Sequence, residues 1–177
     1  MPSEVIIPGF VVIAVLLVVS VYAVSTLTST ISELASAVRA QGESVAKLYN
    51  RVEVLEVRVN GYDNVTSTLD LTILVENRGE DPIYLMDKCD LIVEYSSVDS
   101  KVVARRLRYG DEWSIEYVII AGNFSVPFEE RRFVGSGEVG AIRAVFSASD
   151  IDLGKPFKVV FVSHYGTRGS KWVFYSA

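Results

Sequence analysis

The sequence has very few of the residues from which catalytic and metal sites are built. Its 177 residues include one cysteine, Cys89, and one histidine, His164. A single cysteine excludes an internal disulfide and a cysteine-based zinc cluster, and a single histidine excludes a His-rich metal site. With a net charge of −5, the chain also lacks the basic field of a nucleic-acid-binding protein. We therefore expect a protein that is not an enzyme and has no cofactor, metal or nucleic-acid partner.

The remaining candidates for chemistry have simpler structural explanations. His164 follows an alternating segment, so we expect a partly exposed side chain at a strand end. Cys89 is expected to be a small buried apolar residue rather than a reactive thiol. The spacing of Asp150 and Asp152 suits calcium, but the glycine and terminal glutamate of an EF-hand loop are missing. We expect the charges of Arg105-Arg106 and of residues 129–132 to be solvated.

Charged residues are absent from positions 5–32, and this gap contains the longest apolar run. Fourteen of the 20 residues from Val5 to Val24 are Val, Ile, Leu or Phe. A 20-residue helix spans about 30 Å, the thickness of the hydrocarbon core of a bilayer. We expect a retained transmembrane helix, because no basic segment precedes the run and it exceeds the usual length of a signal peptide. The alternatives are a secretory signal cleaved near Val21–Ala23 and a buried core helix.

The orientation of this helix follows from the C-terminal part. Only four residues precede the apolar run, so the bulk of the protein lies on the other side of the membrane. Two N-glycosylation sequons, at Asn64 and Asn123, favour an external location for it. The positive-inside rule adds little, because the first basic residue is Arg39. We expect a single-pass membrane protein with its N-terminus inside and its C-terminal domain outside.

An apolar stripe with heptad spacing continues beyond the apolar run. Its members, at steps of three and four residues that also include the polar Gln41, are Val24, Leu27, Ile31, Leu34, Val38, Val45 and Leu48. This a/d spacing predicts that the membrane helix continues as an amphipathic stalk, so residues 1–48 form one helical unit. The stripe packs either on the chain's own globular domain or, as we favour, on the same stripe of neighbouring copies in a homo-oligomer.

After residue 50 the apolar pattern changes from helical to alternating. Strand-like segments occur at 52–59, 69–76, 91–95, 157–161 and 172–175. Turn sequences separate the strands; they are Asn60-Gly61, Asn77-Arg78-Gly79, Asp81-Pro82, Tyr109-Gly110-Asp111, Gly135-Ser136-Gly137 and Gly166-Thr167-Arg168-Gly169. We expect seven to nine short strands in an Ig-like antiparallel β-sandwich over residues 49–177, and an α+β fold for the whole chain.

Three short segments carry a resemblance to a known family. They are Met1-Pro2-Ser3-Glu4-Val5-Ile6 before the apolar helix, Gln41-Gly42-Glu43-Ser44 near the end of the stalk, and the Asn-x-Gly turn within Leu74–Ile83. In these features the chain resembles the archaellum accessory proteins FlaG and FlaF, relatives of the archaellins in the type IV filament superfamily. The resemblance implies a hydrophobic N-terminal helix, an extracellular Ig-like sandwich, and a static role in anchoring the filament to the surface layer. The opening segment is closer to FlaG.

The position of Glu4, at the start of the apolar run, also matches a feature of this superfamily. Type IV filament subunits carry an acid near the start of the apolar helix that neutralises a neighbour's amino terminus; the alternative is an acid at headgroup level at a helix start. Filament subunits also begin with a basic leader ending in Lys/Arg-Gly, which this sequence does not contain. This difference favours an uncleaved accessory protein.

The leading hypothesis is a structural, membrane-anchored component of the archaellum, the motility organelle of archaea. It would act as a stator or anchor through helix bundling and extracellular contacts of the sandwich. The expected partners are further copies of the chain, the membrane, a FlaF-like or other archaellum protein, and the surface-layer protein. The alternatives are an archaellin- or pilin-type filament subunit and a surface receptor module with a polar ligand pocket.

Overall fold

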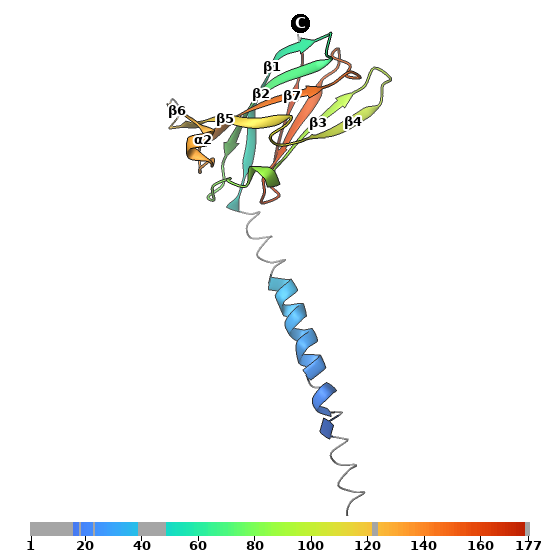
Figure 1. The fold of residues 1–177 in the computed structure, drawn as a ribbon, viewed down its shortest axis with the longest axis vertical. Coiled ribbons are helices and arrows are strands. Elements are labelled where there is room, and N and C mark those ends of the chain that lie inside the picture. Colours follow the sequence, from blue (N-terminus) through green and yellow to red (C-terminus); the bar gives the residue numbers. More distant parts are fainter. Residues whose placement is uncertain (1–15, 18, 23, 39–48, 122–123, 176–177) are drawn as a thin grey trace, which may run out of the picture. The chain divides into compact units, whose positions relative to one another are not determined.

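Two antiparallel β-sheets pack face to face in the computed structural model (Figure 1). The residues that the structure describes are 16–17, 19–22, 24–38, 49–121 and 124–175. The chain forms two compact units, Met1–Ser44 and Val45–Ala177. The described residues of the first unit are helical, and the second unit holds the two sheets.

The second unit contains nine strands and two short helical segments within its described residues. In chain order these are β1 (Val52–Asp63), β2 (Thr68–Asn77), η1 (Met86–Lys88), β3 (Asp90–Ser96), β4 (Val102–Leu107), β5 (Trp113–Ile120), β6 (Phe124–Pro127), α2 (Phe128–Arg131), β7 (Val139–Ser147), β8 (Phe157–Val162) and β9 (Arg168–Val173).

The strands form a five-stranded sheet in the order β1-β2-β7-β5-β6 and a four-stranded sheet in the order β4-β3-β8-β9. All neighbouring strands run antiparallel. Buried and partly exposed residues alternate along β2 and β3, because successive side chains of a strand point to opposite faces of the sheet. The two apolar faces meet between the sheets. The predicted antiparallel β-sandwich is therefore confirmed.

The core between the sheets is built from large apolar side chains of both layers. Its largest fully buried members are Trp113, Phe157, Phe161, Leu69, Leu71, Ile73, Leu91, Ile142, Val93, Val118 and Val159. The Trp113 ring on β5 meets the Phe161 ring on β8 edge-on, with centroids 6.1 Å apart. Its indole N–H donates a hydrogen bond of 3.2 Å to the carbonyl of Leu107. This tryptophan thus joins the two sheets.

The β1 and β9 edges of the two sheets lie against each other. A Cβ atom at Gly169 would lie 2.8 Å from the carbonyl oxygen of Val52, so the close approach of the two backbones requires glycine here. The Lys171 ammonium on β9 also donates to the carbonyl of Leu55 on β1. This side of the sandwich is consequently closed by backbone contact.

Two of the predicted turns are displaced from their expected positions. Asn60 and Gly61 lie inside β1, where the register with β2 shifts, so this pair forms a bulge and the strand turns later, at 64–67. Arg168 and Gly169 already belong to β9, and that strand ends at Val173. In both cases pairing with the neighbouring strand outweighs the local turn preference of glycine.

The first unit is helical at 16–17, 19–22 and 24–38. Five of its hydroxyl side chains each donate to a backbone carbonyl three or four residues earlier; they are Thr26, Thr28, Ser29, Thr30 and Ser36. Within the described ranges, no helix has the length and apolarity needed to span a membrane. Most of the predicted transmembrane segment, 5–15 with 18 and 23, lies outside the described residues.

Candidate interaction surfaces

The apolar stripe of the helix is exposed along its described part. The exposed fractions lie between 62 and 67% for Val24, Leu27, Ile31, Leu34 and Val38. Val45, Leu48 and the predicted N-terminal acid, Glu4, lie outside the described residues. Within the helical unit taken by itself, five apolar side chains of one heptad series are thus exposed.

The chain enters the sandwich through a buried asparagine. Asn50 is only 2% exposed; its side-chain amide donates to the Asp81 carboxylate (3.1 Å), and its side-chain oxygen accepts from the Asp81 backbone N–H (3.2 Å). Gly79 packs directly on it, since a Cβ there would lie 2.7 Å from the Asn50 Cα. The Asn-x-Gly turn that contributes to the family resemblance is thus the place where the start of β1 is held.

Asn77 fixes this turn from inside. Its side chain is 1% exposed and donates to the carbonyls of Asp81 (2.8 Å) and Val134 (3.0 Å). Its side-chain oxygen accepts the Gly79 N–H at 3.0 Å. Because these three bonds satisfy a buried amide, we assign Asn77 a positioning role at this end of the sandwich.

A partly buried ion pair lies next to this turn. The Glu138 carboxylate accepts hydrogen bonds from both the Arg131 guanidinium and the Gly135 backbone N–H, the latter at 2.7 Å. The Arg131 guanidinium also lies 4.4 Å from the centre of the Phe133 ring. The expectation that residues 129–132 carry only solvated charges is therefore wrong for Arg131, because α2 places it over a buried carboxylate.

A similar correction applies to the predicted solvated pair Arg105-Arg106. Arg105 on β4 reaches across to the five-stranded sheet, where it donates to the carbonyl of Ser147 and to the Glu112 carboxylate. Arg106 points to the other face and pairs with Asp90 at 2.5 Å. Adjacent residues of a strand face opposite sides, so only Arg106 has the exposed environment that was expected.

The other candidates for chemistry are occupied by ordinary contacts. Cys89 is 4% exposed, and burial raises the pKa of its thiol to about 12, so the prediction of a buried apolar cysteine is confirmed. Asp150 accepts the Tyr95 hydroxyl at 2.8 Å, and Asp152 pairs with Lys155 at 3.2 Å. Within the part of the chain that the structure describes, no group of three acidic, His or Cys side chains suitable for a metal ion is present.

His164 lies in the β8–β9 hairpin between two tyrosine rings. The ring centroids are 4.8 Å from Tyr84 and 3.9 Å from Tyr165. Neither imidazole nitrogen is exposed, and neither has a hydrogen-bond partner in the described part of the chain. Burial lowers the pKa of this imidazole below its ordinary value, because the charged form loses hydration without gaining a partner.

This environment makes the stability of the sandwich depend on pH. Below about pH 6.5 the imidazole takes up a proton more readily in the unfolded chain than in the folded one, so the free energy of unfolding falls as the pH decreases. We expect His164→Phe to remove this component, since a phenyl ring keeps the contacts with the tyrosines and needs no hydrogen bonds. Urea denaturation of both proteins between about pH 7.5 and 5.5 measures it. A difference in unfolding free energy that does not change with pH would contradict the prediction.

The Asn64 sequon lies at the tip of the β1–β2 hairpin. Asn64 is exposed, and Asp63 shapes the loop by accepting the Val65 N–H and the Thr66 hydroxyl, each at 2.8 Å. Asn123 lies outside the described residues. Glycosylation of either residue stays a prediction.

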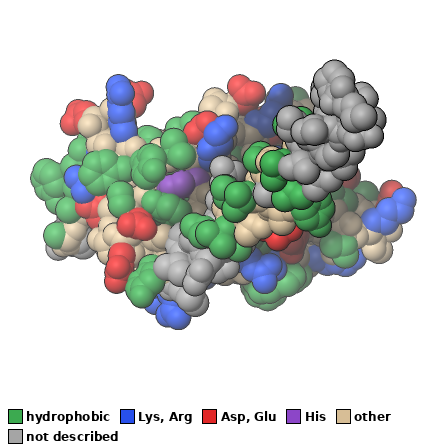
Figure 2. Space-filling model, turned by 90° about the horizontal axis from the view of Figure 1, so that it is seen from below, with side chains coloured by type: hydrophobic (Ala, Val, Ile, Leu, Met, Phe, Trp, Pro, Cys, Tyr) green, Lys and Arg blue, Asp and Glu red, His purple; other side chains and the backbone are tan. Residues whose placement is uncertain are grey.

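Sequence patterns did not reveal two surface hollows at the end where β1 begins. Figure 2 looks onto the molecule from this end and shows basic and acidic side chains around green apolar ones. The first hollow lies between the starts of β1 and β9 and is lined on both sides by arginines. We call Arg51, Arg78 and Arg168 the arginine edge. These residues are up to 117 positions apart, so no sequence motif could have joined them.

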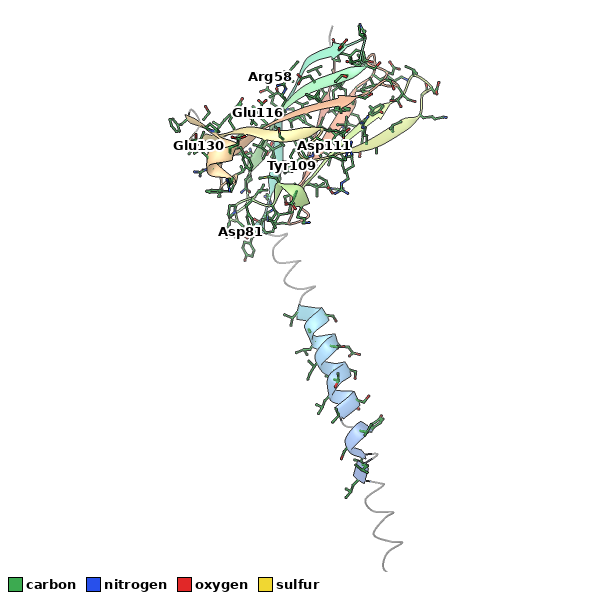
Figure 3. The ribbon with its side chains drawn as sticks, in the orientation of Figure 1. Arg58, Asp81, Tyr109, Asp111, Glu116 and Glu130 are labelled. Atoms are coloured by element: carbon green, nitrogen blue, oxygen red, sulfur yellow. The ribbon has the colours of Figure 1, made fainter. Side chains whose placement is uncertain are left out.

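The second hollow lies where β4 ends and α2 begins. Its lining includes Tyr84, Asp87, Tyr109, Phe128 and Glu129, which we call the tyrosine hollow. Figure 3 labels Tyr109 after β4 and Glu130, the residue that follows Glu129, on α2. Three segments that are far apart along the chain contribute to this hollow, and only the folding of the two sheets brings them together.

Comparison with known proteins identifies the fold rather than a family. No protein-family model matches the sequence, and no curated protein matches it. Among solved structures, the chain is similar to the archaeal flagellum of Methanospirillum hungatei strain JF1, with 13% identity, a TM-score of 0.55, and coverage of 96% of this chain and 92% of that chain. The chain has the fold of an archaeal flagellum protein.

Two further solved structures come from Sulfolobus acidocaldarius. The archaellum periplasmic stator protein FlaG is 12% identical, with a TM-score of 0.47 over 70% of this chain and 99% of that chain. A structure of the stator complex of FlaF and FlaG is 11% identical, with a TM-score of 0.45 over 70% of this chain and 88% of that chain. Support for the resemblance inferred from the sequence comes from the flagellum structure, at the level of the fold.

Proposed function

We propose that this chain is a structural subunit of an archaellum-type surface assembly, with a FlaG-like role as a stator or anchor. The helix of residues 1–48 holds the chain in the membrane with its N-terminus inside and bundles with the helices of further copies. The sandwich of residues 49–177 lies outside, where it contacts a FlaF-like partner or the surface layer. The exposed heptad stripe from Val24 to Val38 is the observation that carries this proposal.

The chemistry of the stripe supports bundling. Five apolar side chains in one series would remain in contact with water on an isolated helix, and burying each contributes about 1.5–3 kcal/mol. Five hydroxyl groups on the rest of the helix are bonded to its own backbone, so these five need no partner from another chain. Association of the helices therefore buries apolar surface and leaves none of these five hydroxyl groups without a hydrogen-bond partner.

The second candidate function is that of a filament subunit. The likeness to the archaeal flagellum structure covers 96% of this chain, which is more than the sandwich alone could account for. Cell fractionation separates the two candidates: a stator or anchor stays with the membrane when filaments are sheared off, whereas a filament subunit is recovered in the sheared filaments.

Bundling is tested by placing charge in the stripe. In full-length protein purified in mild detergent, Ile31→Glu with Leu34→Glu is expected to raise the dissociation constant of the oligomer at least tenfold, because about 1.4 kcal/mol of lost interaction already has that effect. Analytical ultracentrifugation over a range of protein concentrations measures the change.

The matched control places the same charges outside the stripe. The control variant is Ser29→Glu with Ser36→Glu. Ser29 lies two positions before Ile31 and Ser36 lies two positions after Leu34, and both occupy the heptad position farthest from a helix partner. This variant should associate like the unmodified chain. Equal association of the two variants, or a chain that is monomeric at every concentration, would refute helix bundling.

A further inference from the structure

The sandwich has two lateral edges with different side chains. The strand orders place β1 and β9 at one edge, and β4 and β6 at the other. The arginine edge belongs to the first, and the tyrosine hollow lies beside the second, next to the residues that follow β4 and β6. Two different surfaces thus lie on opposite sides of the same end of the sandwich.

Two of the three arginines of the arginine edge have no ion-pair partner among the described residues of the chain. Arg78 pairs with Glu53 at 2.6 Å and with Glu76 at 2.5 Å. Arg51 and Arg168 are exposed and form no ion pair within 49–121 and 124–175. Although the chain as a whole is acidic, this edge offers two guanidinium groups to a partner.

The tyrosine hollow has the features that bind a guanidinium group. Tyr84 and Tyr109 are 51 and 38% exposed as residues, and an aromatic face attracts a guanidinium ion. Two carboxylates, Asp87 and Glu129, line the hollow together with Arg132, and Asp87 also lies 3.5 Å from the exposed Lys88 ammonium. A carboxylate can accept two parallel hydrogen bonds from an arginine. Burial, together with the negative charge of Asp87, raises the pKa of Tyr109.

We propose that the arginine edge of one copy binds the tyrosine hollow of the next copy. This inference rests on the proposed function, since it specifies how the heads of assembled copies meet. Arg51 and Arg168 supply the cations, and the rings and carboxylates of the hollow receive them. A second copy is the favoured occupant because one chain carries both halves of the contact. Two unlike surfaces form a heterologous contact, which repeats from copy to copy as a ring or a helical array.

Disulfide crosslinking tests the contact directly. We would introduce Ser170→Cys beside the arginine edge and Glu130→Cys beside the tyrosine hollow in the same full-length chain, and oxidise it in mild detergent. The two positions lie on opposite edges of one sandwich, so bonds between them join different copies, and a ladder of dimers, trimers and longer products is expected. Cys89 contributes little, because it is buried.

The control pair moves one cysteine to the other end of the sandwich. Ser170→Cys with Ser149→Cys should give no ladder. Covalent dimers from Ser170→Cys alone would mean that like edges meet, which overturns the proposal. A double-cysteine chain that yields no ladder would also overturn the proposal, whether the chain is monomeric, assembled, or bound at its hollow by another protein.

Charge reversal tests the chemistry. In the crosslinking chain, Arg51→Glu with Arg168→Glu should reduce the ladder at least tenfold, and adding Asp87→Lys with Glu129→Lys should restore most of it. Lys101→Glu with Lys155→Glu makes the same change in net charge at the far end of the sandwich and should leave the ladder intact. A ladder that persists after reversal at the arginine edge would refute the role of the two arginines.

Failure of this inference can be distinguished from failure of the proposed function. If head contacts are wrong but bundling is right, the ladder is missing while sedimentation still shows an oligomer that Ile31→Glu with Leu34→Glu dissociates. If bundling is wrong but the head contact is right, the stripe variant has no effect on sedimentation, and the ladder forms and responds to charge reversal.

Discussion

Replacement of Trp113 by alanine is expected to lower the free energy of unfolding of the sandwich by about 3–5 kcal/mol, the usual cost of removing a large buried aromatic side chain. The Trp113 side chain is 2% exposed, and its ring meets those of Tyr109 and Phe161 at the centre of the core. The variant leaves a cavity between the sheets and removes the donor to the Leu107 carbonyl. Urea denaturation followed by circular dichroism measures the loss.

The second tryptophan of the chain provides the matched control. Trp172 on β9 is 59% exposed, and the Lys158 ammonium lies 6.0 Å from the centre of its ring. Trp172→Ala should therefore cost less than about 1 kcal/mol, as surface substitutions usually do. Because the chain has two tryptophans, this variant also leaves Trp113 as its one source of tryptophan fluorescence. Similar losses for both variants would show that Trp113 does not occupy the centre of the core.

The second large effect is expected from Asn77→Ala, with a loss of about 2–4 kcal/mol. The N–H of the buried Gly79 would lose its side-chain partner, at about 1–3 kcal/mol. The Asp81 carbonyl would also lose the partly buried bond that it accepts from Asn77. The Val134 carbonyl is less affected, since it also accepts the Ile83 N–H at 2.9 Å. Urea denaturation measures this loss too.

An exposed asparagine with the same number of side-chain bonds serves as the control. Asn60 on β1 donates to Asp70 and Thr72, and accepts from Thr72, all on the outer face of the five-stranded sheet. Water can replace these partners, so Asn60→Ala should change the stability by less than about 0.5 kcal/mol. The prediction for Asn77 fails if the two asparagine variants are equally stable.

Local sequence patterns predicted the sandwich because each strand pattern has a local cause. A strand that faces a core on one side and solvent on the other alternates apolar and polar residues, and this alternation is clear from Leu69 to Glu76 and from Leu91 to Tyr95. The Asn77–Gly79 turn was predicted for the same kind of reason. Prediction failed at Asn60-Gly61, because a bulge within a paired strand and a turn between two strands have the same local preference.

The charged residues show a different limit. Arg105 and Arg106 are neighbours of the same type, yet one crosses to the other sheet and the other pairs on the outer face. Arg131 was expected in solvent and instead contacts a buried glutamate that follows it by seven residues. A charge is buried only when a partner is brought to it by the fold, and the sequence does not state which partner that is.

The sequence by itself determined the alternating strands, the heptad stripe from Val24 to Leu48, the buried cysteine and the scarcity of catalytic side chains, because each depends on the type and spacing of nearby residues. Only the tertiary structure decided the order of the strands in the two sheets, the network around Asn77, and the placement of the arginine edge and the tyrosine hollow on opposite edges. These features join residues that are far apart along the chain, and their positions are set by which strands pair and how the two sheets pack.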